Sequence, residues 1–351
     1  MATRLTAEEA SETLQPNLIA LCVIMLTLST LALSLRMWSN YINPAHNWWW
    51  DDFFAVITLP FIIAETGLIF WWIKLGLGKH AATTSPEDLA KGPKIIFIAA
   101  FLYDSNISLP KFSALFFYRR IFQRTNIWFT AALWTVSIMN AGWLLSAWLS
   151  TVFQCTPVNA AWETVPGSTC ISQWGWFFGT AIPSMIIDLC ILILPLPLLW
   201  GLRASPARRF LVGVVFLCGY SVIVVSIGRL VTLASAGTHL LDDLTWTTVT
   251  YLEWVQCEGP ISLISVCLPS IIYLTKSIKE KVANNTHGTR GTSKTFRSST
   301  ASQQDQLVTM DDYSPLQQSS SQKQVKNYSP LQQSGSPRQV EEGLHRQELA
   351  V

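Results

Sequence analysis

Seven ionisable side chains lie inside long apolar stretches of this chain, where a charged group is costly to place. They are Glu65, Asp104, Lys111, Asp188, Arg229, Glu253 and Glu258. In such surroundings charged groups pair with one another, line a polar cavity, or take part in the movement of ions or protons. Burial disfavours the charged form of a carboxyl group, so an acid among them could also stay protonated and donate a hydrogen bond. These residues are therefore the candidate polar network or ligand cavity.

The stretches that carry these residues are long enough to cross a bilayer, because about 20 apolar residues in a helix span roughly 30 Å. The sequence predicts seven such segments, at 18–35, 53–73, 95–117, 127–153, 174–199, 210–234 and 246–274. Hydrophobic residues make up 50% of the chain and charged residues 13%, about half the charged fraction of a typical soluble domain. We therefore expect an all-α membrane protein built as a seven-transmembrane-helix bundle.

Lysine and arginine in the loops indicate the orientation, because cytoplasmic loops carry an excess of both. With the C-terminus inside, more of them fall on the inner side than on the outer side. The lysine-bearing loop between the second and third segments is the exception. We expect an outside N-terminus at 1–16, a membrane domain at 17–275, and a disordered cytoplasmic tail at 276–351.

Depth within the bilayer, at about 1.5 Å per residue, sorts the ionisable residues into layers. Arg229 and Glu253 fall in the outer third, and opposite charges at equal depth predict that they pair. Lys111 and Asp188 fall toward the inner side and are predicted to pair in the same way. Three acids near the midplane have no evident basic partner: Glu65, Asp104 and Glu258. The pairs could lock helix packing or act as a switch, since removing one partner of a buried pair costs about 3 to 5 kcal/mol. The midplane acids could line a cavity for a small ligand, ion or proton.

Two cysteines, Cys155 and Cys170, lie in the loop between the fourth and fifth segments. The expected orientation places this loop outside, where oxidising conditions preserve disulfides. The sequence predicts a disulfide between them, with two free thiols as the alternative. The other cysteines fall within the apolar segments, where a thiol behaves as a small apolar filler.

Short motifs occur in a characteristic order along the chain. They are Asp51-Asp52, Gly76-Leu77-Gly78-Lys79-His80, Lys111 followed by Phe117-Tyr118-Arg119-Arg120-Ile121-Phe122, Cys155-Thr156-Pro157 with Trp162 and Cys170, Asp188 followed by Leu194-Pro195-Leu196-Pro197, and Glu258 with Cys267-Leu268-Pro269. In this combination the chain resembles the fungal rhodopsin-domain integral membrane proteins over about residues 17–275. The resemblance implies a fungal seven-helix membrane domain, whose members include receptor-like proteins and others encoded beside secondary-metabolite pathways.

The family's label suggests retinal, which needs a lysine inside the membrane, normally in the seventh helix, with a carboxylate counter-ion. The interior of segment 246–274 contains no lysine, and Lys276 lies beyond its end. We therefore expect neither retinal nor another cofactor. No pattern of residues predicts a catalytic or metal site, although an enzyme acting on an apolar intermediate stays open.

Arg119 and Arg120, at the inner end of the third segment, have two interpretations: anchoring by the positive-inside rule, or contact with a cytoplasmic signalling partner. The tail holds a repeat in which Tyr313-Ser314-Pro315-Leu316 recurs as Tyr328-Ser329-Pro330-Leu331. Each copy resembles a tyrosine-based sorting signal for a clathrin adaptor. Ser314, Ser329 and Ser336 precede proline and could be phosphorylated. A drifted repeat without function is the alternative.

These observations favour a receptor-like protein that senses a small apolar or amphipathic molecule. The alternative is a membrane transporter or membrane-bound enzyme of fungal secondary-metabolite biosynthesis, and structural scaffolding is a third reading. The expected surroundings are a lipid bilayer, at the plasma membrane rather than an endosomal or vacuolar one. A net charge of +2 indicates no nucleic-acid partner.

Overall fold

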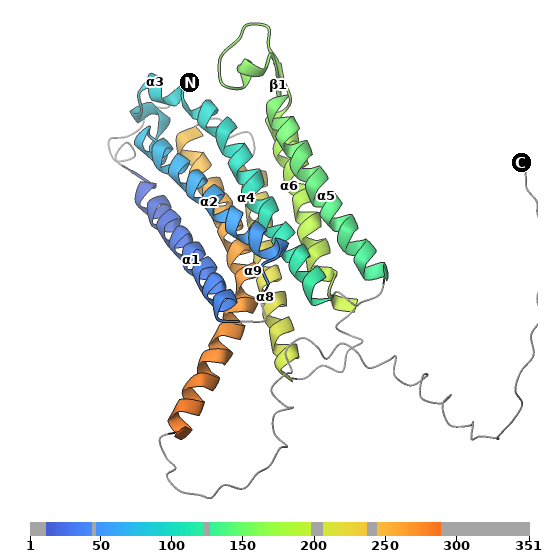
Figure 1. Ribbon diagram of the computed structural model, residues 1–351. Helices are drawn as coiled ribbons and strands as arrows, with labels where there is room; N and C mark the ends of the chain where they lie inside the picture. Colours follow the sequence, from blue (N-terminus) through green and yellow to red (C-terminus); the bar gives the residue numbers. More distant parts are fainter. Residues whose placement is uncertain (1–11, 44–46, 123–126, 198–205, 237–243, 289–351) are drawn as a thin grey trace, which may run out of the picture. The chain divides into compact units, whose positions relative to one another are not determined.

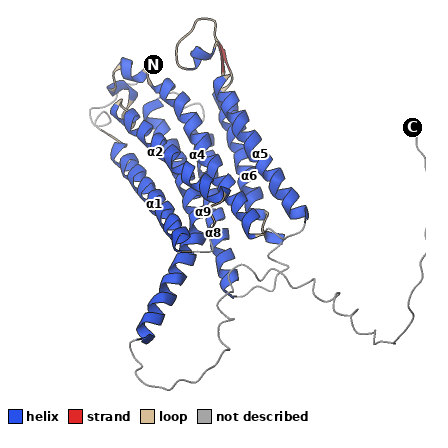
Figure 2. Ribbon diagram, in the orientation of Figure 1, coloured by secondary structure: helices blue, strands red, loops and turns tan. Residues whose placement is uncertain are grey.

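The computed structural model describes residues 12–43, 47–122, 127–197, 206–236 and 244–288. Within them, long helices dominate the fold (Figures 1 and 2). They are α1 (Gln15–Ile42), α2 (Trp50–Lys74), α4 (Gly92–Ile121), α5 (Ile127–Val152), α6 (Gln173–Ile193), α8 (Pro206–Ala236) and α9 (Leu244–Gly288). Each predicted apolar segment coincides with one of these helices or overlaps it.

Six of the described helical segments have the length and composition of a membrane span. They are Gln15–Ile42, Trp50–Lys74, Pro86–Ile121, Ile127–Val152, Gly175–Ile193 and Thr245–Ile272. Helix α8 contributes a shorter apolar stretch, Gly219–Ser235. Large apolar side chains such as Leu31, Ile138 and Leu145 are more than half exposed on the outer faces of α1 and α5, as expected for helices in contact with lipid.

Two predicted helix ends differ from the observed ones. Helix α6 ends at Ile193, before the predicted boundary at 199, because Pro195 and Pro197 follow and proline removes a backbone donor. Helix α9 continues to Gly288, beyond the predicted boundary at 274. The repeat and the other tail residues from 289 onward lie outside the described residues.

Helices α4 and α9 each pack against four other helices of the bundle. Helix α4 packs against α2, α5, α6 and α9, and α9 packs against α1, α2, α4 and α8. Apolar side chains fill these contacts, with Leu115 and Ile187 between α4 and α6 and Leu18 and Val249 between α1 and α9. Polar side chains on the buried faces of α4 and α9 are therefore positioned by neighbours on several sides.

The glycine motif after α2 joins three helix ends. Gly76 and Gly78 have φ values of 111° and 85°, which residues other than glycine rarely adopt. The Gly78 N–H donates to the Thr245 carbonyl at 2.9 Å, and the Leu14 N–H donates to the Gly78 carbonyl at 2.9 Å. The His80 ring stacks on Trp246, with centroids 4.1 Å apart. The motif therefore connects the end of α2 to the starts of α1 and α9.

A short hairpin follows α5. Strands β1 (Cys155–Thr156) and β2 (Thr169–Cys170) pair antiparallel, with Cys155 opposite Cys170, and the two cysteines form a disulfide. The predicted disulfide is confirmed. The connecting segment includes the 3-10 turn η3 (Val158–Ala161), and the Trp162 ring packs edge-on against Phe97 of α4, with centroids 5.0 Å apart. Figure 1 shows this hairpin at the same end of the bundle as α3 (Pro86–Leu89) and the start of α4. We call it the hairpin end.

Candidate functional site

A buried ion pair between α8 and α9 lies at the centre of the polar network. Arg229 Nε lies 3.0 Å from Glu258 Oε2, and both side chains are at most 3% exposed. The Tyr103 hydroxyl of α4 donates to Glu258 Oε2, and the Ser226 hydroxyl donates to Oε1 at 2.7 Å. The Arg229 guanidinium also lies over the Tyr103 ring, 5.4 Å from its centroid. Glu258 thus joins α4, α8 and α9.

The predicted pairing of Arg229 with Glu253 is wrong, because Arg229 pairs with Glu258. Glu253 is only partly buried. Depth placed Glu253 beside Arg229, but depth does not say which face of α9 each acid occupies, since successive residues of a helix turn by about 100°. The five residue steps from Glu253 to Glu258 rotate the side chains by about 140°, so they point from different faces of α9. Glu258, predicted to lack a basic partner, has one.

The predicted pair between α4 and α6 is confirmed. Lys111 Nζ lies 3.0 Å from Asp188 Oδ2, and both side chains are buried. Lys111 Nζ also donates to the Ser184 carbonyl at 3.0 Å and to its hydroxyl at 2.8 Å. The ammonium therefore has three oxygen partners on α6.

The two remaining midplane acids lie in different surroundings. Glu65 of α2 accepts a hydrogen bond from Asn106 Nδ2 of α4 at 2.6 Å. Asn106 packs tightly against Gly259 of α9, where a Cβ atom would lie 2.4 Å from Asn106 Nδ2. Asp104 is 4% exposed, and its Oδ2 has no hydrogen-bond partner among the described residues. The polar network thus extends from α2 through α4 to α9.

A second charged cluster, not predicted from the sequence, lies at the end opposite the hairpin. Arg36 Nη2 lies 2.7 Å from Asp51 Oδ2 and 2.9 Å from Asp52 Oδ1, and Arg36 Nε donates to Asp52 Oδ1 at 3.0 Å. Arg36 Nη1 also donates to the Val266 carbonyl of α9 at 2.5 Å. These contacts tie α1, α2 and α9. Equal depth could have revealed them, because Arg36 directly follows the first predicted segment and the Asp pair directly precedes the second.

The two arginines predicted as inner-face contacts both engage groups of the protein. Arg120 Nη1 lies 3.3 Å from Asp51 Oδ1 and 3.5 Å from Asp52 Oδ2. Arg119 lies over the Trp134 ring, 4.8 Å from its centroid. Arg120 thereby completes a cluster of two arginines and two aspartates, which we call the four-charge cluster.

A cavity of about 190 Å³ lies at the hairpin end and is bounded by α2, α4, α5, α6, α9 and the segment around the hairpin. Its wall is mostly aromatic and aliphatic, with Trp72, Phe97 and Phe177 among its members. Glu65 and Tyr103 lie on the same wall, so the cavity reaches the polar network. We call this space the hairpin-end cavity.

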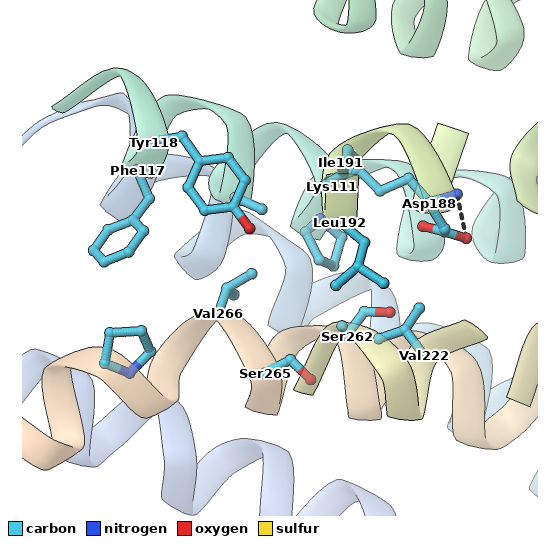
Figure 3. Close-up of a pocket in the computed structure, with 14 residues that line it drawn as sticks. Lys111, Phe117, Tyr118, Asp188, Ile191, Leu192, Val222, Ser262, Ser265 and Val266 are labelled. Carbon is cyan, nitrogen blue, oxygen red and sulfur yellow. Dashed lines mark ion pairs between the residues drawn. The ribbon is translucent and has the colours of Figure 1, made fainter. Parts of the chain in front are cut away.

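A smaller cavity of about 80 Å³ lies toward the other end of the bundle (Figure 3). The ion pair of Lys111 and Asp188 forms part of its wall, opposite Ser262 and Ser265 of α9. Glu258 does not line either cavity, but it contacts Tyr103, which lines the hairpin-end cavity. The polar network therefore lies between two cavities.

The arrangement can bind a small molecule and link it to several helices. Across the part of the chain that the structure describes, no group of three or more histidine, cysteine or acidic residues could hold a metal ion. Glu65, Asp188 and Glu258 each have a hydrogen-bond or basic partner, whereas Asp104 Oδ2 has no hydrogen-bond partner among the described residues.

The long apolar helices and buried charges define a multi-pass integral membrane protein in contact with the lipid bilayer. The family model of the fungal rhodopsin domain matches residues 35–277, and the chain belongs to this family. No solved structure shows a significant match to the chain.

Among its relatives is a polyenoic acids biosynthesis gene cluster protein of Metarhizium anisopliae, 28% identical over 62% of this chain and 62% of the relative. A SAT4 family membrane protein of Emericella nidulans is 26% identical over 63% of this chain and 53% of the relative. A wortmanamides biosynthesis cluster protein of Talaromyces wortmannii is 23% identical over 59% of this chain and 58% of the relative. The chain therefore spans between about half and two thirds of these relatives' length.

Proposed function

We propose that the protein is a receptor-like membrane protein that senses a small apolar or amphipathic molecule in the hairpin-end cavity. The observation that carries this proposal is the connection of that cavity to the ion pair of α8 and α9. Tyr103 lines the cavity and donates to Glu258, which pairs with Arg229. A molecule bound there would contact a residue that also holds the relative positions of three helices.

A bound molecule can shift the bundle only if it binds one arrangement of the helices better than another. Contact with the Tyr103 ring or with Glu65 would change the hydrogen bonds that these residues make to Glu258 and Asn106. Because helices slide and rotate as packed units, a change at α4 would be passed to α8 and α9. The cavity near Lys111 and Asp188 lies toward the other end of the same helices, where a cytoplasmic partner could respond to the change in helix positions.

The proposal includes seven transmembrane helices, an outside N-terminus and an inside C-terminus. The length of α8, Pro206–Ala236, and its apolar stretch Gly219–Ser235 support its role as the additional span. The distribution of lysine and arginine supports the orientation, which places the hairpin-end cavity on the outer side. We also propose that the protein lies in the plasma membrane and that it binds no retinal. Lys111 is already engaged by Asp188 and Ser184, which supports a structural role for this amine.

A second candidate function is transport or enzymatic conversion of an intermediate in secondary metabolism. It is favoured by the names of two relatives, which describe proteins of biosynthesis clusters. The carboxyl groups of Glu65, Asp104 and Glu258 would then handle the substrate or a proton rather than report binding.

The test compares a strain that lacks the protein with strains complemented by the wild type, Tyr103→Phe or Tyr220→Phe. Tyr103→Phe removes the hydroxyl that donates to Glu258, whereas Tyr220 is 61% exposed and serves as the matched control. A receptor predicts a broad transcript change on deletion that wild type and Tyr220→Phe reverse and Tyr103→Phe does not. Accumulation of one compound without a broad transcript change would instead support the metabolic role and contradict the receptor proposal.

A further inference from the structure

Two polar atoms on the wall of the hairpin-end cavity make no hydrogen bond to the residues that the structure describes. The indole nitrogen Nε1 of Trp176 on α6 and the hydroxyl oxygen of Thr248 on α9 are buried and make no hydrogen bond to any described residue. Thr248 is 6% exposed. A buried polar group without a partner is destabilising, so such groups in a cavity wall indicate a polar ligand.

The chemistry of these two groups restricts what they can bind. An indole N–H donates a hydrogen bond and cannot accept one, and a threonine hydroxyl can do both. A ligand that satisfies Trp176 must therefore offer an acceptor, such as a carbonyl, ether or hydroxyl oxygen. An ammonium group offers only donors and would leave the indole unpaired.

The charge of the wall disfavours anions. The described residues that line the cavity include no lysine, arginine or histidine, and Glu65 is the acid among them. The nearby guanidinium of Arg229 is already paired with Glu258. A carboxylate ligand would therefore enter an apolar space without a cation, at a high desolvation cost.

The size of the cavity sets the size of the ligand. A cavity of about 150 Å³ with an apolar wall can hold benzene, and the hairpin-end cavity has about 190 Å³. Its aromatic members, Phe97, Trp176 and Phe177, can pack against the ligand's apolar body. One ring with a short polar substituent fits this space.

We propose that the hairpin-end cavity binds a small neutral molecule whose apolar, ring-sized body carries an acceptor oxygen, received by Trp176 Nε1 or by the Thr248 hydroxyl. This inference rests on the proposed function, because it names the ligand class of the same cavity.

The test titrates the full chain in lipid nanodiscs with four probes of similar size: acetophenone, ethylbenzene, benzoate and benzylamine. Saturation-transfer NMR measures binding, and empty nanodiscs supply the background from partitioning into lipid. We expect acetophenone to bind about 2- to 12-fold more tightly than ethylbenzene, the range for one additional hydrogen bond. Benzoate and benzylamine should bind more weakly than acetophenone.

Two pairs of variants locate the effect. Thr248→Val keeps the shape of the wall and Trp176→Phe keeps an aromatic ring in it, and both remove a donor, so together they should abolish the preference for acetophenone over ethylbenzene. Ala100→Leu fills the cavity, which Ala100 lines, and should reduce binding of every probe. Ala141→Leu, at an exposed position of α5, is its control and should leave binding unchanged.

Tighter binding of benzoate or benzylamine than of acetophenone would overturn the ligand class while leaving a binding cavity in place. Equal binding of acetophenone and ethylbenzene by the wild type, or no binding of any probe above empty nanodiscs, would also overturn it. The transcript comparison with Tyr103→Phe tests the receptor role separately, so the ligand class can fail while that role stands.

Discussion

Replacing Arg36 by glutamine tests whether the four-charge cluster stabilises the bundle. Among the described residues, the cluster contains two arginines and two aspartates, whose formal charges balance. Arg36→Gln would leave one excess negative charge among side chains that are almost fully buried. Breaking a buried ion pair by removing one partner costs about 3 to 5 kcal/mol, and we expect a loss of stability of that size.

The contacts of Arg36 show why the charge should dominate this loss. The guanidinium donates four hydrogen bonds: one to Asp51, two to Asp52 Oδ1, and one to the Val266 carbonyl. Hydrogen bonds between membrane helices average about 0.6 kcal/mol each, so four account for roughly 2 to 3 kcal/mol. Glutamine can keep one or two of them. A loss above about 3 kcal/mol would therefore exceed what the lost hydrogen bonds account for, and we attribute the excess to the missing positive charge.

The assay is reversible unfolding of the full chain in mixed micelles, followed by tryptophan fluorescence. Lys91→Gln is the matched control, because Lys91 pairs with Asp88 at 2.8 Å on the surface, where its side chain is 51% exposed. An exposed pair contributes little, so the control should be close to wild type. The double variant Arg36→Gln with Asp52→Asn removes one charge of each sign and should recover a large part of the loss.

Two results would refute this reasoning. One is an Arg36→Gln variant that is no less stable than Lys91→Gln. The other is a double variant whose loss of stability equals the sum of the losses caused by Arg36→Gln and by Asp52→Asn alone. Charge balance would then contribute nothing to stability.

Two further predictions concern packing and the hairpin. Gly259→Val should lower stability by about 1 to 3 kcal/mol, the range for overpacking, because its Cβ would meet Asn106. Gly142→Val is the control, because a Cβ at Gly142 meets no atom within 4 Å. Unfolding in mixed micelles measures the stability of both variants, and equal stability would contradict the close contact. Replacing Cys155 and Cys170 by serine should lower stability by about 3 kcal/mol, the value for a closed loop of 15 residues. A reducing agent should lower the wild type's thermal midpoint and leave the double-serine variant unchanged, and an unaffected wild type would contradict the prediction.

Depth along a helix predicts an ion pair only where the helical phase also agrees. The pair of Lys111 and Asp188 was predicted correctly because both side chains happen to face the contact of α4 with α6. The same reasoning failed for Arg229, because Glu253 and Glu258 lie on different faces of α9. Without knowing which helices are neighbours, the sequence cannot rank two acids on one helix.

The four-charge cluster was missed for a related reason. Arg120 was interpreted as a positive-inside anchor or as a contact with a signalling partner, and neither interpretation names a partner within the protein. Equal depth points from Arg36 to the two aspartates, but the cluster forms only where packing brings the end of α1, the start of α2 and the end of α4 together. The hairpin-end cavity was likewise invisible, because Trp176 and Thr248 are ordinary residues of apolar segments until two helices place them around one space.

The sequence by itself determined the helices, the class of protein and the disulfide. Apolar length determines which segments can cross a bilayer, and the two cysteines outside those segments are close enough in the chain to pair. These are properties of short segments, which do not depend on which helix lies beside which. The tertiary structure alone decided the partner of Arg229, the four-charge cluster and the cavity walls. Each of these combines side chains from several helices, whose rotation and neighbours are set by packing across the whole bundle.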